Sequence, residues 1–116
     1  MSQILLSQSI DIGTESTYIQ KAPYAGLLKD VTVSWPAGCN GLVEVAVGYG
    51  SVQVTPIEGF IALNDKIITW YLGERYYVDR GAILWQKSRN YDAVYVHTIV
   101  VVVTLEPVRE GYGRKD

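Results

Sequence analysis

The chain offers few residues that could do acid–base or nucleophilic chemistry. His97 is the only histidine and Cys39 the only cysteine among the 116 residues. A Ser-His-Asp triad would have to combine His97 with an acid such as Asp92, but no Gly-x-Ser-x-Gly pattern is present to expose a serine nucleophile. We therefore predict no catalytic residue and a protein that is not an enzyme. We expect His97 to pack at the start of a strand and to hydrogen-bond a backbone group.

Metal and phosphate chemistry are equally weakly indicated. One histidine and one cysteine cannot supply the three or four protein ligands that zinc requires. Asn64-Asp65 and Asn90-x-Asp92 carry oxygens of the kind that calcium prefers, but both are ordinary turn sequences without the ligand density of an EF-hand loop. Gly48-x-Gly50 lacks the Gly-Lys-Ser/Thr that completes a phosphate loop, and it indicates a bulge or bend in a strand. We predict no metal and no cofactor.

The composition limits the classes of partner. A net charge of -2, with the arginines separated by acids, gives no basic surface for nucleic acid or an anionic membrane. The start of the chain, Met1–Ser7, lacks the basic region and the sustained apolar run of a signal peptide, so we expect synthesis in a cytoplasm. A lone cysteine means that no disulfide can form within the chain.

Short apolar–polar alternations with frequent turn signals, and no helical apolar stripe, predict an all-β fold. We expect an antiparallel two-sheet β-sandwich in a single domain over residues 1–108, with a jelly roll as the preferred topology and an immunoglobulin-like sandwich as the alternative. Residues 109–116 are polar and rich in glycine, and we expect a flexible tail. The expected strands lie at 4–12, 17–20, 27–35, 43–49, 51–55, 57–63, 66–72, 76–78, 82–87 and 94–105.

The strand expected at Val94–Leu105 is apolar on both faces, whereas a sandwich strand needs only one. Ile99, Val101, Val103 and Leu105 would face the core, and the other face would then need a cover from elsewhere. We predict that this second face and the N-terminal arm, residues 1–12, form an oligomer interface. The residues expected in it are Val94, Val96, Val100, Val102, Ile4 and Leu6.

Nine tyrosines and three tryptophans stand against one phenylalanine, a ratio that suits half-exposed positions at grooves and subunit contacts. Rings that line one groove could stack on sugars, which makes a carbohydrate-binding module the alternative function. The other interpretation is that Trp70 and Trp85 lie in the core and that the tyrosines cover subunit contacts. The candidate glycan contacts are Trp70, Tyr71, Tyr76, Tyr77, Trp85 and Tyr91.

Four loop segments in a fixed order carry a resemblance over residues 30–105: Trp35 to Val43, Gln53-Val54-Thr55-Pro56, Arg89-Asn90-Tyr91-Asp92, and His97-Thr98-Ile99 before a run of valines. In this order the chain resembles small jelly-roll proteins encoded among the structural genes of tailed phages and related viruses. The resemblance implies a non-enzymatic virion protein, a capsid decoration or head-fibre subunit that forms a cyclic homo-oligomer such as a trimer and docks on a major capsid or other virion protein. It implies turn-forming roles for Gly38, Asn40 and Gly41, and loop-fixing hydrogen bonds for Asn90, Asp92 and His97.

Overall fold

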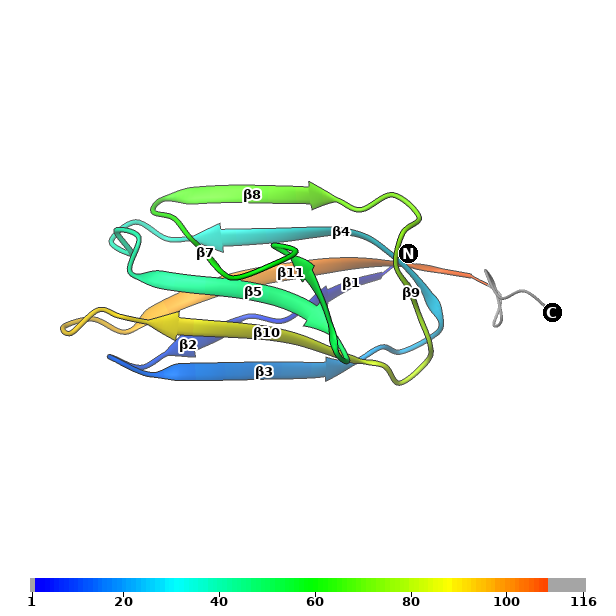
Figure 1. Ribbon diagram of the computed structural model, residues 1–116, viewed down its shortest axis with the longest axis horizontal. Coiled ribbons are helices and arrows are strands. Elements are labelled where there is room, and N and C mark those ends of the chain that lie inside the picture. The colour runs from blue at the N-terminus through cyan, green and yellow to red at the C-terminus, as the bar shows by residue number, and fades with distance from the viewer. Residues whose placement is uncertain (1, 109–116) are drawn as a thin grey trace.

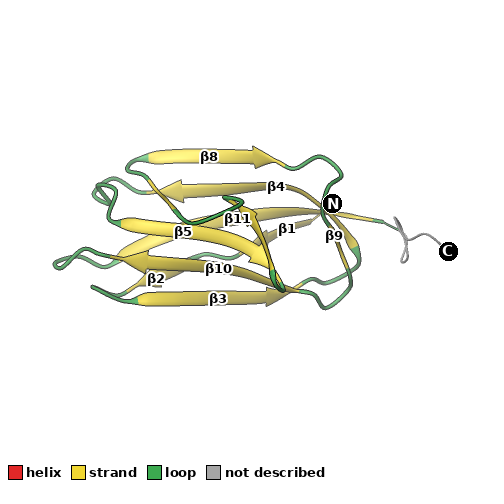
Figure 2. Ribbon diagram, in the orientation of Figure 1, coloured by secondary structure: helices red, strands yellow, loops and turns green. Residues whose placement is uncertain are grey.

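The computed structural model describes residues 2–108, which form two antiparallel β-sheets packed face to face, with no helix in that range (Figures 1 and 2). The predicted all-β sandwich is confirmed. The tail predicted at residues 109–116 lies outside the described residues.

The six-stranded sheet has the order β1-β11-β4-β8, with β2 also pairing β11 and β9 also pairing β4. The five-stranded sheet has the order β3-β10-β5-β6, with β7 also pairing β5. The first sheet contains β1 Ser2–Leu5, β2 Gln8–Ile10, β4 Gly26–Trp35, β8 Lys66–Tyr71, β9 Tyr77–Val78 and β11 His97–Pro107. The second contains β3 Glu15–Lys21, β5 Val43–Tyr49, β6 Val52–Thr55, β7 Ile61–Ala62 and β10 Ile83–Asn90.

The pairs of long strands are nested along the chain. The first strands, β1 and β2, both pair the last, β11; β3 pairs β10, β4 pairs β8, and β5 pairs β6. Successive pairs alternate between the two sheets, so each sheet is built from segments far apart in the sequence. The loops β4–β5 and β10–β11 consequently lie together at one end of the sandwich (Figure 1).

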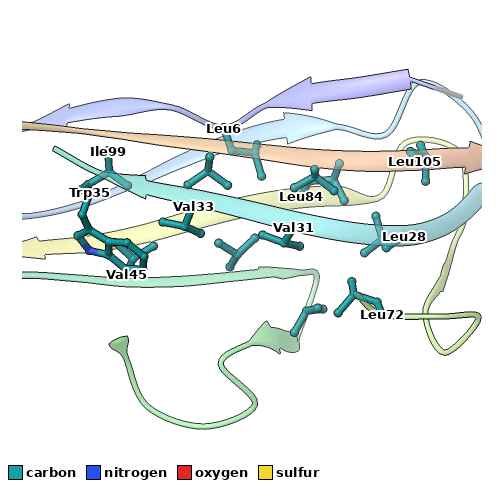
Figure 3. Packing of buried hydrophobic residues seen from close by; sticks show 14 of the residues in the cluster. Leu6, Leu28, Val31, Val33, Trp35, Val45, Leu72, Leu84, Ile99 and Leu105 are labelled. Carbon is teal, nitrogen blue, oxygen red and sulfur yellow. The ribbon is translucent and has the colours of Figure 1, made fainter. Parts of the chain in front are cut away.

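The core lies between the two inner faces (Figure 3). In β11 the odd-numbered residues Ile99, Val101, Val103 and Leu105 point inward, as their alternation predicts. Trp35 fills the end near the β4–β5 loop, where it is 1% exposed and its Nε1 donates to Val43 O at 3.1 Å. The indole is thus satisfied within the core.

A buried glutamine joins the two sheets where the N-terminal segment is interrupted. Gln86 of β10 is fully buried; its Nε2 donates to Leu6 O at 3.0 Å and its Oε1 accepts from Gln8 Nε2 at 2.7 Å. At the same point Val101 N donates to Ser7 Oγ at 3.2 Å. The single strand predicted over residues 4–12 is therefore wrong, because side chains replace backbone partners at positions 6 and 7 and divide it into β1 and β2.

Other strand limits also differ from the sequence prediction: the strand expected over 57–63 is reduced to Ile61–Ala62, the one expected over 17–20 is extended to Glu15–Lys21, and two differences affect the region of the site. β10 continues to Asn90 rather than ending at Lys87, and its inward residues after Leu84 are the polar Gln86, Ser88 and Asn90. β11 begins at His97 rather than at Val94, because Asp92 holds residues 92–95 in a turn. By contrast, the bulge expected near Gly48 is confirmed by a register shift after Val47.

Candidate functional site

A hollow that contains polar residues lies at the end formed by the β4–β5 and β10–β11 loops. It has a volume of about 560 Å³ and contains Asp92 and His97. Its apolar wall comes from four exposed residues, which we call the tip cluster: Leu42, Val94, Tyr95 and Val96, between 37% and 65% exposed. The hollow therefore combines one buried polar pair with a mostly apolar wall.

Asp92 organises the loop around this hollow. Its Oδ1 accepts from Val94 N at 2.8 Å and from Tyr95 N at 3.3 Å, and its Oδ2 lies 2.8 Å from His97 Nε2. The hydrogen bond with His97, followed by that from Val94, lowers the pKa of Asp92 below its ordinary value. His97 therefore bonds a carboxylate, and the expectation of a backbone partner is wrong.

Asn90 completes the loop. Its Nδ2 donates to Ile10 O and to Tyr95 O, both at 3.0 Å, and its Oδ1 accepts from Asp92 N at 2.9 Å. The hydrogen bonds expected of Asn90, Asp92 and His97 are present, and they act structurally: they connect the β10–β11 loop to β2 and determine where β11 begins.

Cys39 lies in the neighbouring loop but has no nucleophilic character. Its side chain is fully buried, and burial, with the nearby Asp92 carboxylate, raises the pKa of the thiol. A protonated, inaccessible thiol cannot attack a substrate. The hydrogen-bonded His97–Asp92 pair lies beside this loop.

The two candidate calcium sequences form turns. Asn64 Oδ1 accepts from Gly38 N at 3.0 Å and from Asn40 N at 2.8 Å, and Asp65 and Asn40 each adopt a φ of +50°. The side-chain oxygens of Asn64 and Asp92 are thus engaged with backbone N–H groups or His97. Within residues 2–108, no three His, Cys, Asp or Glu side chains gather closely enough to hold a metal ion.

The outer face of the six-stranded sheet, which we call the open face, carries the second apolar side of β11. Val100 is 42% exposed and Val102 is half-buried. The register places Leu5, Val102, Thr32 and Thr69 in one row, and Val100, Ser34 and Ile67 in the next. A third row holds Gln3, Thr104, Asp30 and Tyr71, so Asp30 is the one charged residue in these rows of the described strands.

The residues predicted for the oligomer interface separate into three groups. Val100 and Val102 lie on the open face, whereas Val94 and Val96 lie in the β10–β11 loop and belong to the tip cluster, because β11 starts only at His97. Leu6 is fully buried in the core of its own chain, and Ile4 packs against that core. The prediction for Leu6 is therefore wrong, because β1 and β2 pair β11 of the same chain and turn this side chain inward.

The six aromatic residues predicted as glycan contacts do not meet in one groove. Trp70 and Tyr76 pack against the core, and Tyr76 makes an edge-to-face contact with Tyr49 at 6.2 Å between ring centroids. Tyr71 is 83% exposed on the open face, Tyr91 is exposed at the tip, and Tyr77 lies in β9. Trp85 points outward from β10, on the opposite side of the sandwich. Because its side chain points outward, the interpretation that places Trp85 in the core is wrong, whereas Trp70 does pack against the core.

Comparisons with protein-family models, with curated proteins and with solved structures give no match. Within residues 2–108 there is no helix of the length and apolarity needed to cross a membrane. The tip cluster and the open face are therefore the surfaces from which a function can be proposed.

Proposed function

We propose that the protein is a non-enzymatic structural subunit of a virion, of the capsid decoration type, which associates with copies of itself and docks on a larger assembly. The observation that supports this most strongly is the open face. Exposed apolar side chains and small hydroxyls cover the three rows from Leu5 to Tyr71, where Asp30 is the one charge, and the Lys29–Glu106 ion pair lies next to them. Contiguous exposed apolar surface of this kind is typical of protein–protein interfaces.

The proposed topology is a jelly roll. A jelly roll can be described as a long hairpin rolled into two sheets. Its strand pairing is nested, because the first strand pairs with the last and the second with the second-last. The strand orders β1-β11-β4-β8 and β3-β10-β5-β6 support this reading. The virion setting is supported by the resemblance of the loop segments to small phage structural proteins.

The size of the open face bears on the kind of assembly. Four strands spaced by about 4.8 Å, over about 25 Å of ladder, give a face of roughly 500 Å². Two such faces would remove roughly 1,000 Å² from water, which is at the low end for a specific interface. An assembly that also uses the tip cluster would bury more surface. A ring of copies, such as a trimer, is the form that we favour, with the open face of one copy against a different surface, such as the tip cluster, of the next.

The experiment is the solution mass of the full chain, measured by light scattering on a sizing column. We expect an oligomer for the wild type and a folded monomer for Val100→Asp and Val102→Asp, because a carboxylate on the open face would have to be desolvated in the interface. Ile19→Asp is the matched control, since Ile19 is 56% exposed on β3 in the other sheet.

A monomeric wild type at high concentration, or Val100→Asp and Val102→Asp proteins with the wild-type mass and circular dichroism, would refute self-association through the open face. Circular dichroism separates a monomer that is folded from one that has lost the sandwich.

A further inference from the structure

The outer face of the five-stranded sheet contains a hollow that the proposed assembly does not use. Its volume is about 370 Å³ and it is lined by Thr17, Ala46, Gln53, Phe60, Trp85 and Lys87. These residues come from β3, β5, β6, β10 and the segment between β6 and β7. The hollow and the open face lie on opposite sides of the sandwich.

Trp85 is held in place at the edge of this hollow. A Cβ on Gly48 would collide with the Trp85 ring and with Val52 O, so the absence of a side chain at position 48 lets the indole lie over β5. The indole Nε1 donates to Gly50 O at 3.0 Å, which fixes the orientation of the ring. The aromatic surface is thus positioned before any ligand arrives, and little side-chain freedom is left to lose.

Phe60 provides a second aromatic wall, and it is also fixed. The Arg89 guanidinium carbon lies 4.0 Å from the centroid of the Phe60 ring, and Arg89 Nε donates to Glu15 Oε2 at 3.0 Å. This stacking holds the segment between β6 and β7 over the sheet.

Gln53 provides the next constraint. Its Nε2 donates to Pro56 O at 2.7 Å and to Gly59 O at 2.6 Å, which pins both ends of the same segment. With its amide nitrogen engaged, Gln53 can offer its Oε1 as an acceptor to a ligand.

The charge in the hollow is balanced. Lys87 Nζ lies 3.2 Å from Glu15 Oε1, so the lysine can still donate hydrogen bonds while the carboxylate offsets its charge. Thr17 adds a hydroxyl that can donate or accept. The polar groups therefore suit a neutral ligand with several hydroxyls better than an anion.

We propose that this hollow binds the pyranose ring of a neutral sugar. Trp85 and Phe60 offer faces on which the C–H side of the ring stacks, and Gln53, Lys87 and Thr17 hydrogen-bond its hydroxyls. The volume is near the lower limit of small-molecule sites, which corresponds to one sugar unit of a glycan rather than an extended chain. This is a binding site independent of self-association, and it is built on Trp85 and Phe60 rather than on the wider set of aromatic residues.

The test uses the full chain on an array of neutral oligosaccharides of glucose, galactose, mannose and N-acetylglucosamine, followed by calorimetric titration of any sugar retained. We expect Trp85→Ala to weaken the association about tenfold, which corresponds to the loss of one aromatic stacking contact. Tyr71→Ala, which removes an exposed ring from the open face, should leave the association unchanged.

Lys87→Met is a second variant that keeps the aliphatic stem, and we expect it to weaken binding severalfold without unfolding the protein. If Trp85→Ala does not fold, the sugar affinity of Lys87→Met tests the proposed site instead. Retention of no neutral sugar by the wild type, or equal affinity of the wild type and a folded variant at either position, would overturn the proposal.

The proposals of self-association through the open face and of sugar binding in the hollow can be refuted independently. A Val102→Asp monomer should bind sugar as well as the wild type, and a Trp85→Ala protein should keep the wild-type mass.

Discussion

The two outer faces of the sandwich differ far more than the two inner faces. Inside, both sheets contribute valine, leucine and isoleucine to one core. Outside, the open face of the six-stranded sheet has exposed valine and isoleucine beside threonine and serine, with Asp30 and the Lys29–Glu106 ion pair as its charges in the described ladders. The five-stranded sheet has an ion-pair network, a covering segment between β6 and β7, and the aromatic hollow. The shared interior therefore stabilises the fold, and the outer faces are where specific recognition is expected.

Small residues in the five-stranded sheet are one cause of the difference between the two outer faces. On the five-stranded sheet Gly48 and Ala46 leave room for Trp85 and for the segment that carries Phe60. On the open face the outward positions of β11 carry β-branched side chains that range from 42% exposed at Val100, through a half-buried Val102, to 7% exposed at Thr104. One outer face is covered by a segment of its own chain, and the other is the face for which we propose a partner copy.

Placing valine at equivalent outward positions should show this difference most strongly. Gly48→Val should destabilise the fold by about 3 kcal/mol, because the new side chain collides with the Trp85 ring and with the β6 backbone. Ser34→Val, on the open face, should change the free energy of unfolding by less than about 0.5 kcal/mol. Urea unfolding of both variants measures the two values, and equal values would remove the distinction between a covered and an open face.

Removing the polar contact that joins the sheets should have the next largest effect. Gln86→Leu leaves Leu6 O without its buried donor and removes one of the acceptors of the Gln8 amide, which keeps Ser16 O, and we expect a loss of about 2 kcal/mol. The same urea titration measures it. Hydrogen exchange should report faster exchange in β1 and β2 than in β3, since Gln86 fixes the break between them; uniform exchange would argue against this role.

The β10–β11 loop, which connects the two sheets, should make the free energy of unfolding depend on pH through Asp92. Because the pKa of Asp92 is lowered in the folded state, its contribution to stability is present above the ordinary carboxyl pKa and is lost as the pH falls through the lowered value. Asp92→Asn keeps an oxygen for Val94 and Tyr95 but removes the charge. The variant should lose less stability than the wild type on acidification below pH ~4. Parallel acid titrations followed by circular dichroism would contradict this expectation if the two slopes coincide.

The smallest effect is expected for the ion pairs on the outer face of the five-stranded sheet. Glu15→Gln removes the partner of Lys87 and Arg89, but all three side chains are partly exposed and water screens them. Thermal melts should show a slight decrease that disappears in concentrated sodium chloride. A decrease that persists in salt would mean that the network holds the covering segment in place.

The sequence predicts the fold well where one face of a strand is apolar and the other polar. The strand at residues 43–49 has the predicted limits, and the inward side of β11 is as its alternation predicts. The pattern fails for β10, where Gln86, Ser88 and Asn90 point inward and Trp85 outward, the reverse of what hydrophobicity indicates. Gln86 and Asn90 can be buried because Leu6 and Ile10, 80 positions earlier in the chain, supply backbone acceptors, and Asp92 N adds a local donor to Asn90.

The candidate sites were less accessible to sequence reasoning. The run of valines correctly marks the open face at Val100 and Val102, but periodicity could not show that Asp92 would turn Val94–Val96 away from the strand. The hollow depends on Phe60 stacking on Arg89, which is 29 positions later in the sequence. No local pattern predicts such a contact. The absence of a side chain at Gly48 could have been noticed, but its partner Trp85 is identified only by strand pairing.

The position of β11 has a consequence for how the molecule folds. This strand is the last in the described chain, yet it lies inside its sheet, between β1 and β4. Until it is synthesised, β1 and β2 have no partner and one edge of β4 is open. Closing the first strand on the last spans about a hundred residues, so folding is expected to be slow and to be completed only after synthesis. A chain interrupted before His97 would present unpaired strand edges to its neighbours, and aggregation is its expected fate.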